Sequence, residues 1–171
     1  MSTWHRMPSP LGELLLRADA QHLSGVFFVG AAHCPSMPAP QPSAADSAAA
    51  LLARAREQIE AFLSGQCRHF DLPLSLHGTP FQRTVWQALM QIPYGATISY
   101  ATLAQRLGLP SGAARAVGSA NARNPLSLIV PCHRVIAASG TLAGYAGGLA
   151  RKQALLTLER SALQAADQPP G

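Results

Sequence analysis

The residue best suited to covalent chemistry in this sequence is Cys132, which lies between Pro131 and His133 and is followed at one remove by Arg134. Basic neighbours favour the thiolate form, whereas an ordinary thiol with a pKa of about 8.5 is only about 3% ionised at pH 7. The pattern therefore predicts a nucleophilic cysteine in an electropositive setting. The alternative is a buried, unreactive cysteine, because free cysteines are often part of a protein core.

His133 is the nearest candidate for a base that takes the thiol proton. Adjacent side chains point to opposite faces of a strand and do not face each other on a helix, so His133 can act on Cys132 only across a turn or through a water. Such a histidine needs a third group to orient it. The only carboxylates after Asp71 are Glu159 and Asp167, and Asp167 stands in a tail with Pro and Gly. By elimination we predict a Cys132–His133–Glu159 relay, whereas Glu159 alone would be a solvated helix residue.

Charge is unevenly distributed over the 171 residues of the chain. Residues 1–80 carry five basic and six acidic groups, and residues 81–171 carry eight basic and two acidic groups. Between Asp71 and Glu159 there are basic residues but no acidic ones, namely Arg83, Arg106, Arg115, Arg123, Arg134, Arg151 and Lys152. Such a segment suits a nucleic acid, because each phosphate contact releases counterions. The alternative is a mildly basic surface without a partner.

The composition indicates a globular protein with a sizeable core, since 48% of residues are hydrophobic and 12% are charged. No apolar run approaches the roughly 20 residues of a membrane-spanning helix, and we expect no membrane partner. The first residues do not resemble a secretory signal. Cys34, Cys67 and Cys132 are dispersed and form no Cys-x-x-Cys pair, which predicts a reducing, cytoplasmic location.

The first half of the chain predicts a small α/β domain over residues 1–77, without residues that call for chemistry. Its Pro-rich segment at 34–45 cannot form a strand ladder and is expected to be a loop. The other predicted elements are the two strands of a hairpin at 11–16 and 23–29, a helix at 46–63 and a returning strand at 70–76.

The second half predicts a mostly helical domain over residues 78–163, followed by a flexible tail at 164–171. Thr79 and Ser99 can cap its first two helices, with Pro80 at the first position of one of them. The remaining predicted elements are a third helix at 112–123, a buried strand at 126–130 and a last helix at 150–163.

The second and third helices of this half are joined by a tight turn and form a helix-turn-helix candidate. Apart from its arginines, the helix at 112–123 contains almost only Ala, Gly and Ser. Such small side chains allow close approach to a narrow or shallow groove. A tightly packed internal helix is the alternative. The Gly-rich segment 139–148 could crowd a ligand and offer Tyr145 as a flat wall, but it lacks the spacing of a dinucleotide site.

These segments, in this order, resemble the O6-alkylguanine-DNA alkyltransferases, also called methylated-DNA–protein-cysteine methyltransferases. The matching segments are Phe81-Gln82, Val85-Trp86, Ile92-Pro93-Tyr94-Gly95, Ser99-Tyr100, Arg115-Ala116-Val117-Gly118, Asn124-Pro125, Pro131-Cys132-His133-Arg134-Val135 and Gly144-Tyr145-Ala146-Gly147-Gly148. Ser9-Pro10-Leu11-Gly12 resembles the family's N-terminal domain. Each motif alone is weak, whereas all of them together are specific.

The resemblance implies an α+β fold, in which a small ribonuclease H-like domain precedes a helical, winged helix-turn-helix domain. It implies a monomer that binds double-stranded DNA from the minor groove and flips an O6-alkylguanine into a pocket. The alkyl group, or that of an O4-alkylthymine, would pass irreversibly to Cys132. Nothing in the site could hydrolyse a thioether, so each molecule would react once, without a cofactor.

The resemblance also implies a role for each matching residue. His133 would be linked to Cys132 through water and oriented by Glu159. Tyr100 would crowd a phosphate and help to protonate the departing guanine, and Asn124 would brace the recognition helix against the active-site turn.

The other implied roles concern DNA and the pocket. Arg115 would insert into the duplex where the base had been. The further DNA-binding residues would be Tyr100, Ala114, Gly118 and Arg123, and the residues lining the substrate pocket would be Tyr145, Val135, Ala146 and Lys152.

Some relatives hold a structural zinc in the N-terminal domain. The spacings of His33, Cys34, Cys67 and His69 match no strong ligand pattern, so we expect no metal. A non-catalytic winged-helix sensor of alkylated DNA is the main alternative, but members that only sense damage lack the acceptor that is present here as Cys132. A cysteine hydrolase is a second alternative, although no protease-type signature surrounds the cysteine.

Overall fold

The computed structural model describes residues 2–36, 46–140, 145 and 147–167. It divides into two compact units, of which the first comprises Met1–His77 with Pro125–Ile129 and the second Gly78–Asn124 with Val130–Gly171. Helices are combined with a small antiparallel sheet, which confirms a mixed class of helices and strands. No helix in the described ranges is long and apolar enough to cross a membrane.

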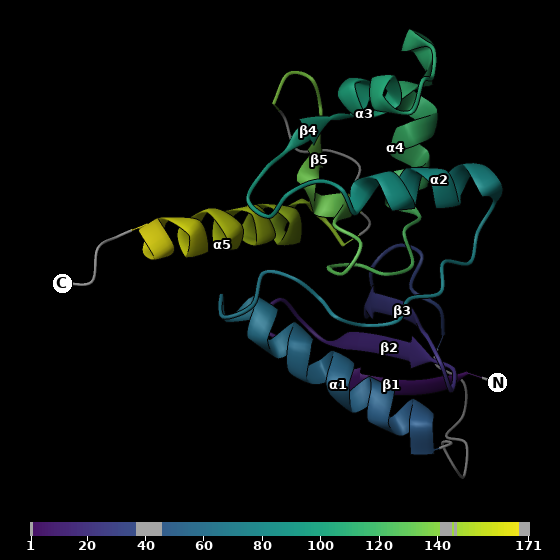
Figure 1. The fold of residues 1–171 in the computed structure, drawn as a ribbon, viewed down its shortest axis with the longest axis vertical. Helices are drawn as coiled ribbons and strands as arrows, with labels where there is room; N and C mark the ends of the chain where they lie inside the picture. The colour runs from purple at the N-terminus through teal and green to yellow at the C-terminus, as the bar shows by residue number, and fades with distance from the viewer. Residues whose placement is uncertain (1, 37–45, 141–144, 146, 168–171) are drawn as a thin grey trace. The chain divides into compact units, whose positions relative to one another are not determined.

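The first unit is a three-stranded antiparallel sheet covered by one helix (Figure 1). Its elements are β1 (Thr3–Met7), β2 (Leu14–Ala18), β3 (Leu23–Phe28) and α1 (Asp46–Leu63). The predicted hairpin is present as β2 and β3, and α1 has the predicted bounds. Ala55, Ile59 and Phe62 are fully buried at helical spacing, which is the pattern of a helix with one apolar face. The edge strand β1 was not predicted, because its polar side chains give no apolar alternation.

Two predicted strands are reduced to single bridges with β3. Residues 70–76 contribute only an isolated bridge between Leu74 and Leu23, because Pro73 has no N–H to continue a ladder. Residues 126–130 are buried and pair with β3 only at the bridge of Leu126 with Val26, after which they form a turn in which Leu128 has a φ of 75°. Because the Val26 N–H donates to Pro125 O at 2.8 Å, this segment belongs to the first unit rather than to the expected second domain.

The second unit contains four α-helices and a two-stranded parallel sheet in its described part. The elements are α2 (Pro80–Leu89), β4 (Ile98–Ser99), α3 (Tyr100–Arg106), the 3-10 helix η1 (Ser111–Ala113), α4 (Ala114–Ala122), the 3-10 helix η2 (Cys132–Arg134), β5 (Val135–Ile136) and α5 (Leu149–Asp167). The predicted caps are confirmed, since the Thr79 and Ser99 side chains accept from backbone N–H groups of the first turns.

Two boundaries in this unit differ from the prediction. The helix expected at 112–123 begins as η1 and becomes α-helical only at Ala114. The tail expected from residue 164 is helical up to Asp167, because no helix breaker precedes Pro169. Asp167 is therefore the last residue of α5 and not part of a Pro-Gly tail.

Two contacts place the active-site segment within the second unit. Parallel pairing of Ile98 with Val135 sets the start of α3 beside the end of η2. The buried Trp86 indole donates from Nε1 to Ala120 O at 2.8 Å and joins α2 to α4. The first contact fixes the start of α3 relative to the turn of the nucleophile candidate, and the second fixes the end of α4 relative to α2.

Candidate active site

Cys132 is the first residue of the tight turn η2 and is only 3% exposed. The turn is closed by hydrogen bonds from Cys132 N to Val130 O at 2.7 Å and from Arg134 N to Pro131 O at 3.0 Å. Neighbouring side chains in such a turn are not forced to opposite faces as they are in a strand. Cys132 and His133 therefore lie in a turn, as a relay between adjacent residues requires.

Burial raises the pKa of the Cys132 thiol to about 11, although a hydrogen bond with Asn124 and the charge of Lys152 lower it. The expectation that the setting favours the thiolate was therefore wrong for the resting protein. A buried thiolate loses its hydration, and the two favourable partners do not compensate for that loss. The thiol is protonated at neutral pH and needs a base at the moment of reaction.

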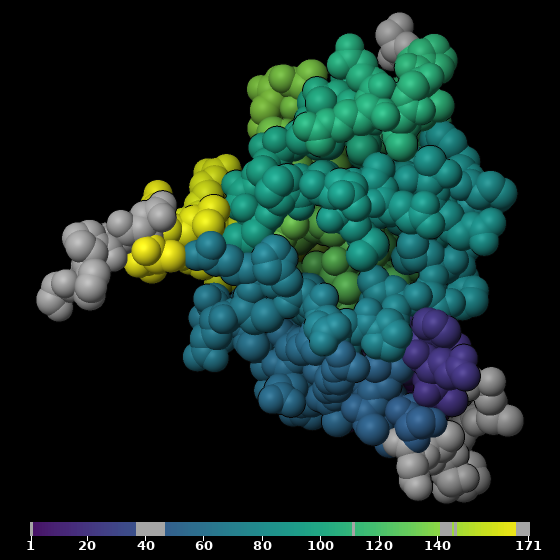
Figure 2. All heavy atoms as spheres, in the orientation of Figure 1, coloured from purple at the N-terminus to yellow at the C-terminus, as the bar shows by residue number. Residues whose placement is uncertain are grey.

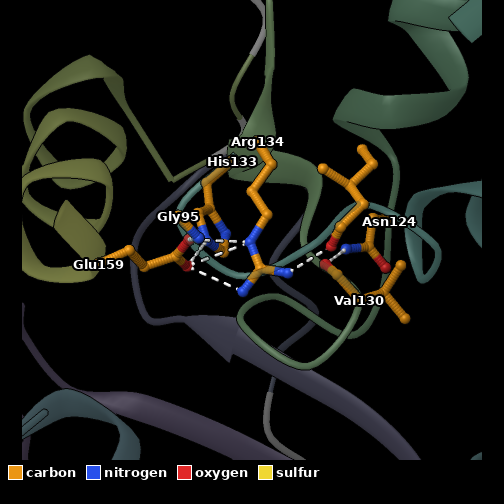
Figure 3. A network of polar contacts seen from close by, with 7 residues as sticks. Gly95, Asn124, Val130, His133, Arg134 and Glu159 are labelled. Carbon is orange, nitrogen blue, oxygen red and sulfur yellow. Dashed lines mark hydrogen bonds and ion pairs between the residues drawn. The ribbon is translucent and has the colours of Figure 1, made fainter. Parts of the chain in front are cut away.

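His133 contacts Glu159 inside the core, as Figure 3 shows. Its Nε2 lies 2.6 Å from Glu159 Oε2, and both side chains are fully buried. Burial alone would raise the pKa of Glu159, but His133 and Arg134 lower it to about 2, so the carboxylate is ionised. An ionised carboxylate only accepts hydrogen bonds, so the His133 proton must lie on Nε2. Nδ1 of a neutral imidazole then carries the lone pair that can take a proton.

The protonation state of His133 suits a general base. Burial lowers the pKa of His133, and the opposing effect of Glu159 does not cancel this. The imidazole is therefore neutral at pH 7. Its Nδ1 is buried and has no hydrogen-bond partner among the residues that the structure describes. The base is ready to accept a proton on the nitrogen that does not face Glu159.

Arg134 makes a second, bidentate contact with the same carboxylate (Figure 3). Its Nε donates to Glu159 Oε1 at 2.9 Å and its Nη2 donates to Oε2 at 3.0 Å, while Nη1 donates to Ile92 O at 2.8 Å. The Gly95 N–H also donates to Oε1, at 2.9 Å. Glu159 thus binds η2 and the turn after Ile92 to α5. This use of Arg134 was not predicted, although the shortage of carboxylates in this half was a signal that a buried arginine would share the only internal one.

Lys152 is fully buried, and its Nζ donates to Val135 O at 2.5 Å. Burial lowers the pKa of Lys152 to about 8, so the ammonium is largely charged at pH 7. Lys152 and Arg134 were both counted among the cations of a polyanion-binding segment. Because they are buried, these two cannot bind a polyanion at the surface, and that interpretation needs correcting for them.

The residues predicted to bind DNA are distributed along α4 and at the start of α3. Arg115 and Arg123 are exposed, while Ala114 and Gly118 are partly exposed. The start of α4 lies at the surface, upper right in Figure 2. Tyr100 is the first residue of α3, and burial raises its pKa to about 12.

The structure places the remaining predicted residues around η2. Asn124 follows α4 and donates from Nδ2 to Val130 O at 2.8 Å, so it closes the loop that leads to Cys132. Val135 is fully buried and Tyr145 is 8% exposed. Ala146, which the sequence assigned to the pocket, lies outside the described residues. In the described ranges no three His, Cys, Asp or Glu side chains cluster as metal ligands would.

Comparison with known proteins gives matches over most of the chain. The family model of the 6-O-methylguanine DNA methyltransferase, DNA binding domain, matches residues 80–161. The methylated-DNA–protein-cysteine methyltransferase of Mycobacterium bovis is 45% identical over 163 residues, which is 94% of both chains. That of Methanosarcina acetivorans is 44% identical over 153 residues, which is 90% of this chain and 95% of the relative. The crystal structure of Mycobacterium tuberculosis OGT in complex with DNA superposes with a TM-score of 0.82 at 44% identity and covers 93% of each chain.

Proposed function

This chain belongs to the methylated-DNA–protein-cysteine methyltransferase family, and we propose that Cys132 is the residue that accepts the alkyl group. The protein repairs DNA directly, by transferring the alkyl group of O6-alkylguanine to itself. The observation that carries the assignment is that Cys132 and His133 are neighbours in one tight turn and that His133 makes a buried contact with Glu159 of α5. The other free thiols are Cys34 and Cys67, and the histidines nearest to them in the sequence, His33 and His69, form no ion pair with a carboxylate in the described part of the chain.

The proposed reaction begins with proton transfer from the Cys132 thiol to His133 Nδ1, directly across the turn or through a water. Glu159 stabilises the imidazolium, because its carboxylate accepts from Nε2. The sulfur then attacks the alkyl carbon, and the new S–C bond forms as the C–O6 bond breaks. Tyr100 gives its proton to the departing guanine, and its phenolate regains a proton from the imidazolium through solvent. The products are guanine and a thioether, which nothing in the site can hydrolyse.

The proposed DNA interface is the exposed side of α4. Arg115 would fill the space that the flipped base leaves, while Arg123, Ala114 and Gly118 would contact the duplex from the minor groove. The support is that Arg115 and Arg123 are exposed and that the neighbouring side chains of α4 are small, which permits close approach. Tyr145, Val135, Ala146 and Lys152 are proposed to line the pocket for the base, and O4-alkylthymine is proposed as a second substrate.

We also propose the finer description of the fold, with a ribonuclease H-like domain at 1–77, to which residues 125–129 are added, and a winged helix-turn-helix domain in the rest of 78–163. Support for the second part comes from α3 and α4, which pack together through η1, and from the β4–β5 pair beside them. The three free thiols support a reducing, cytoplasmic location.

The decisive experiment uses duplex DNA that carries a labelled methyl group on guanine O6. We expect the label to reach about one group per protein molecule and to lie on the peptide that contains Cys132. Cys132→Ala should remove all transfer, whereas the matched variant Cys67→Ala should retain it. Binding without any transfer would support the sensor, and repeated turnover under excess substrate would contradict the irreversible thioether.

A further inference from the structure

A buried amide on α4 is not used by the mechanism described so far. Asn121 is only 1% exposed, and its Nδ2 donates to Cys132 O at 3.2 Å. Its Oδ1 is buried without a hydrogen-bond partner in the described part of the chain. A buried amide with one half unsatisfied costs stability. A leucine would fill the same space without this cost, which points to a specific use of the amide.

The second contact of Asn121 is with Tyr100. Gly118 lies one turn earlier on α4, and a Cβ placed there would be 3.8 Å from the Tyr100 ring, so this side of α4 faces the phenol. The Asn121 side chain forms a hydrogen bond with the Tyr100 side chain and thereby counteracts the rise that burial causes in the pKa of Tyr100. Only a bond donated to the phenol oxygen stabilises the phenolate. Because Asn121 Oδ1 makes no hydrogen bond in the described part of the chain, the bond with Tyr100 comes from the amide nitrogen, and Asn121 uses its N–H groups toward both Cys132 O and Tyr100.

The direction of this bond decides where the tyrosine proton can point. Cys132 O can only accept a hydrogen bond, so this contact fixes the orientation of the Asn121 amide, with its nitrogen toward Cys132 O. The Tyr100 oxygen then accepts from Asn121, and its own O–H is not used in that bond. If Oδ1 faced Tyr100 instead, the phenol would donate its proton to Asn121.

We propose that Asn121 is a positioning residue that directs the Tyr100 hydroxyl proton toward the departing guanine. The inference rests on the proposed function and deepens it. As the C–O6 bond breaks and the S–C bond forms, the electron pair stays with guanine, which takes the Tyr100 proton. The Asn121 N–H holds the resulting phenolate, and the Lys152 Nζ, 5.8 Å from the centre of the Tyr100 ring, adds a positive charge. The thiol proton goes to His133 as before.

Two reagents that deliver the same benzyl group to Cys132 separate this role from a structural one. O6-benzylguanine releases guanine, which needs a proton, whereas benzyl bromide releases bromide, which needs none. Asn121→Leu keeps the volume and removes both hydrogen bonds. We expect it to slow the reaction with O6-benzylguanine about tenfold or more, because general acid catalysis contributes 10²–10⁴-fold. The rate with benzyl bromide should change less than about twofold.

Tyr100→Phe should give the same pattern, and the double variant should be no slower than Tyr100→Phe alone. Ser119→Ala, an exposed change on the same helix, is the control and should react like the wild type with both reagents. Equal slowing with the two reagents would mean that Asn121 only supports the turn at Cys132, and would overturn the inference. Failure of the wild type to react with O6-benzylguanine at Cys132 would instead contradict the proposed function.

Asn121→Asp provides an independent test that nearly preserves shape. An ionised carboxylate can only accept, so it would draw the Tyr100 proton to itself, whereas a protonated carboxyl has one O–H that can donate to the Tyr100 oxygen. Burial raises the pKa of a carboxyl, which brings its titration toward the assay range. The ratio of the O6-benzylguanine rate to the benzyl bromide rate should therefore lie below that of the wild type at pH 8 and rise as the pH falls. A ratio equal to that of the wild type at every pH would contradict the inference.

Discussion

Replacing Glu159 by glutamine tests how the buried carboxylate supports the reaction. The change removes one negative charge and keeps the size of the side chain. Glu159 accepts hydrogen bonds from His133, Arg134 and the Gly95 N–H. After the substitution, His133 faces a neutral amide when it takes the thiol proton, and the Arg134 guanidinium loses its counterion.

The size of the effect follows from the two charges that Glu159 faces. A hydrogen bond to a charged group is worth about 1.5–3 kcal/mol, roughly twice a neutral one, so exchanging one for the other should destabilise the imidazolium by about 1 kcal/mol and slow alkylation by about 4- to 10-fold at pH 7. Leaving Arg134 buried and unpaired should cost about 3–5 kcal/mol of unfolding free energy. Because both effects have one cause, folding must be verified before rates are compared.

The assay is the rate of reaction with free O6-benzylguanine between pH 7 and 10, with native tryptophan fluorescence recorded for every sample. The wild type should depend weakly on pH, because the lowered pKa of His133 keeps this base neutral throughout. In Glu159→Gln the transfer to His133 is weakened, so thiolate formed by ionisation of Cys132 to the solvent contributes more to the rate. Its rate should therefore rise up to about tenfold per pH unit, because the pKa of Cys132 is about 11. The change of charge on Lys152 near pH 8 affects both proteins and cancels in their ratio.

The matched control is Glu60→Gln, which removes an exposed carboxylate that pairs with Arg56 at 3.0 Å. Surface pairs of this kind contribute little, so the rate and the stability of the control should match the wild type. If the folded Glu159→Gln protein ran parallel to the wild type at all pH values, the ionisation argument would be wrong. Its role would then be confined to holding the backbone together.

Further expectations concern DNA, helix ends and acid. Arg115→Ala should slow repair of duplex DNA about tenfold or more while leaving the reaction with free O6-benzylguanine unchanged, because only the duplex requires a base to be extruded; equal slowing would contradict this. Thr79→Ala removes the capping box of α2 and should lower the unfolding free energy in urea by about 1 kcal/mol. Gly95→Ala should cost at least about 2 kcal/mol in the same assay, because φ is +81° and the new methyl group would overlap Leu163. In the wild type, Glu159 contributes about 3 kcal/mol that is present above its usual pKa of 4.5 and is lost as the pH falls toward about 2, which urea titrations across this range should detect.

Local signals in the sequence were sufficient for the helices and insufficient for part of the sheet. The bounds of α1 and the caps at Thr79 and Ser99 follow from short-range rules, because the side chains that decide them lie within one turn. Residues 126–130 have the apolar content of a strand but form a turn, since Asn124 reaches Val130 O and closes the loop. A hydrogen bond across six residues is a tertiary feature that hydrophobic content does not reveal.

Some features of the candidate site could also be predicted from the sequence, and others could not. Cys132, His133 and Glu159 could be connected from the sequence, because the second half offers almost no other carboxylate. The bidentate contact of Arg134, the amide of Asn121 and the raised pKa of the thiol could not be predicted. All three depend on which polar side chains are buried next to one another. The sequence shows that these residues are present but not that they are buried together.

The burial of Cys132 also determines how long the unreacted protein keeps an active thiol. A molecule that reacts once is wasted by any peroxide or stray electrophile that reaches its sulfur first. Oxidants attack the thiolate, and susceptibility follows thiolate character and access. With 3% exposure and a pKa of about 11, the resting sulfur offers little of either, whereas the partly exposed Cys34 and Cys67 can be oxidised without loss of the acceptor. Burial therefore protects the thiol of this single-turnover protein from oxidation. The sulfur becomes reactive when His133 accepts the thiol proton.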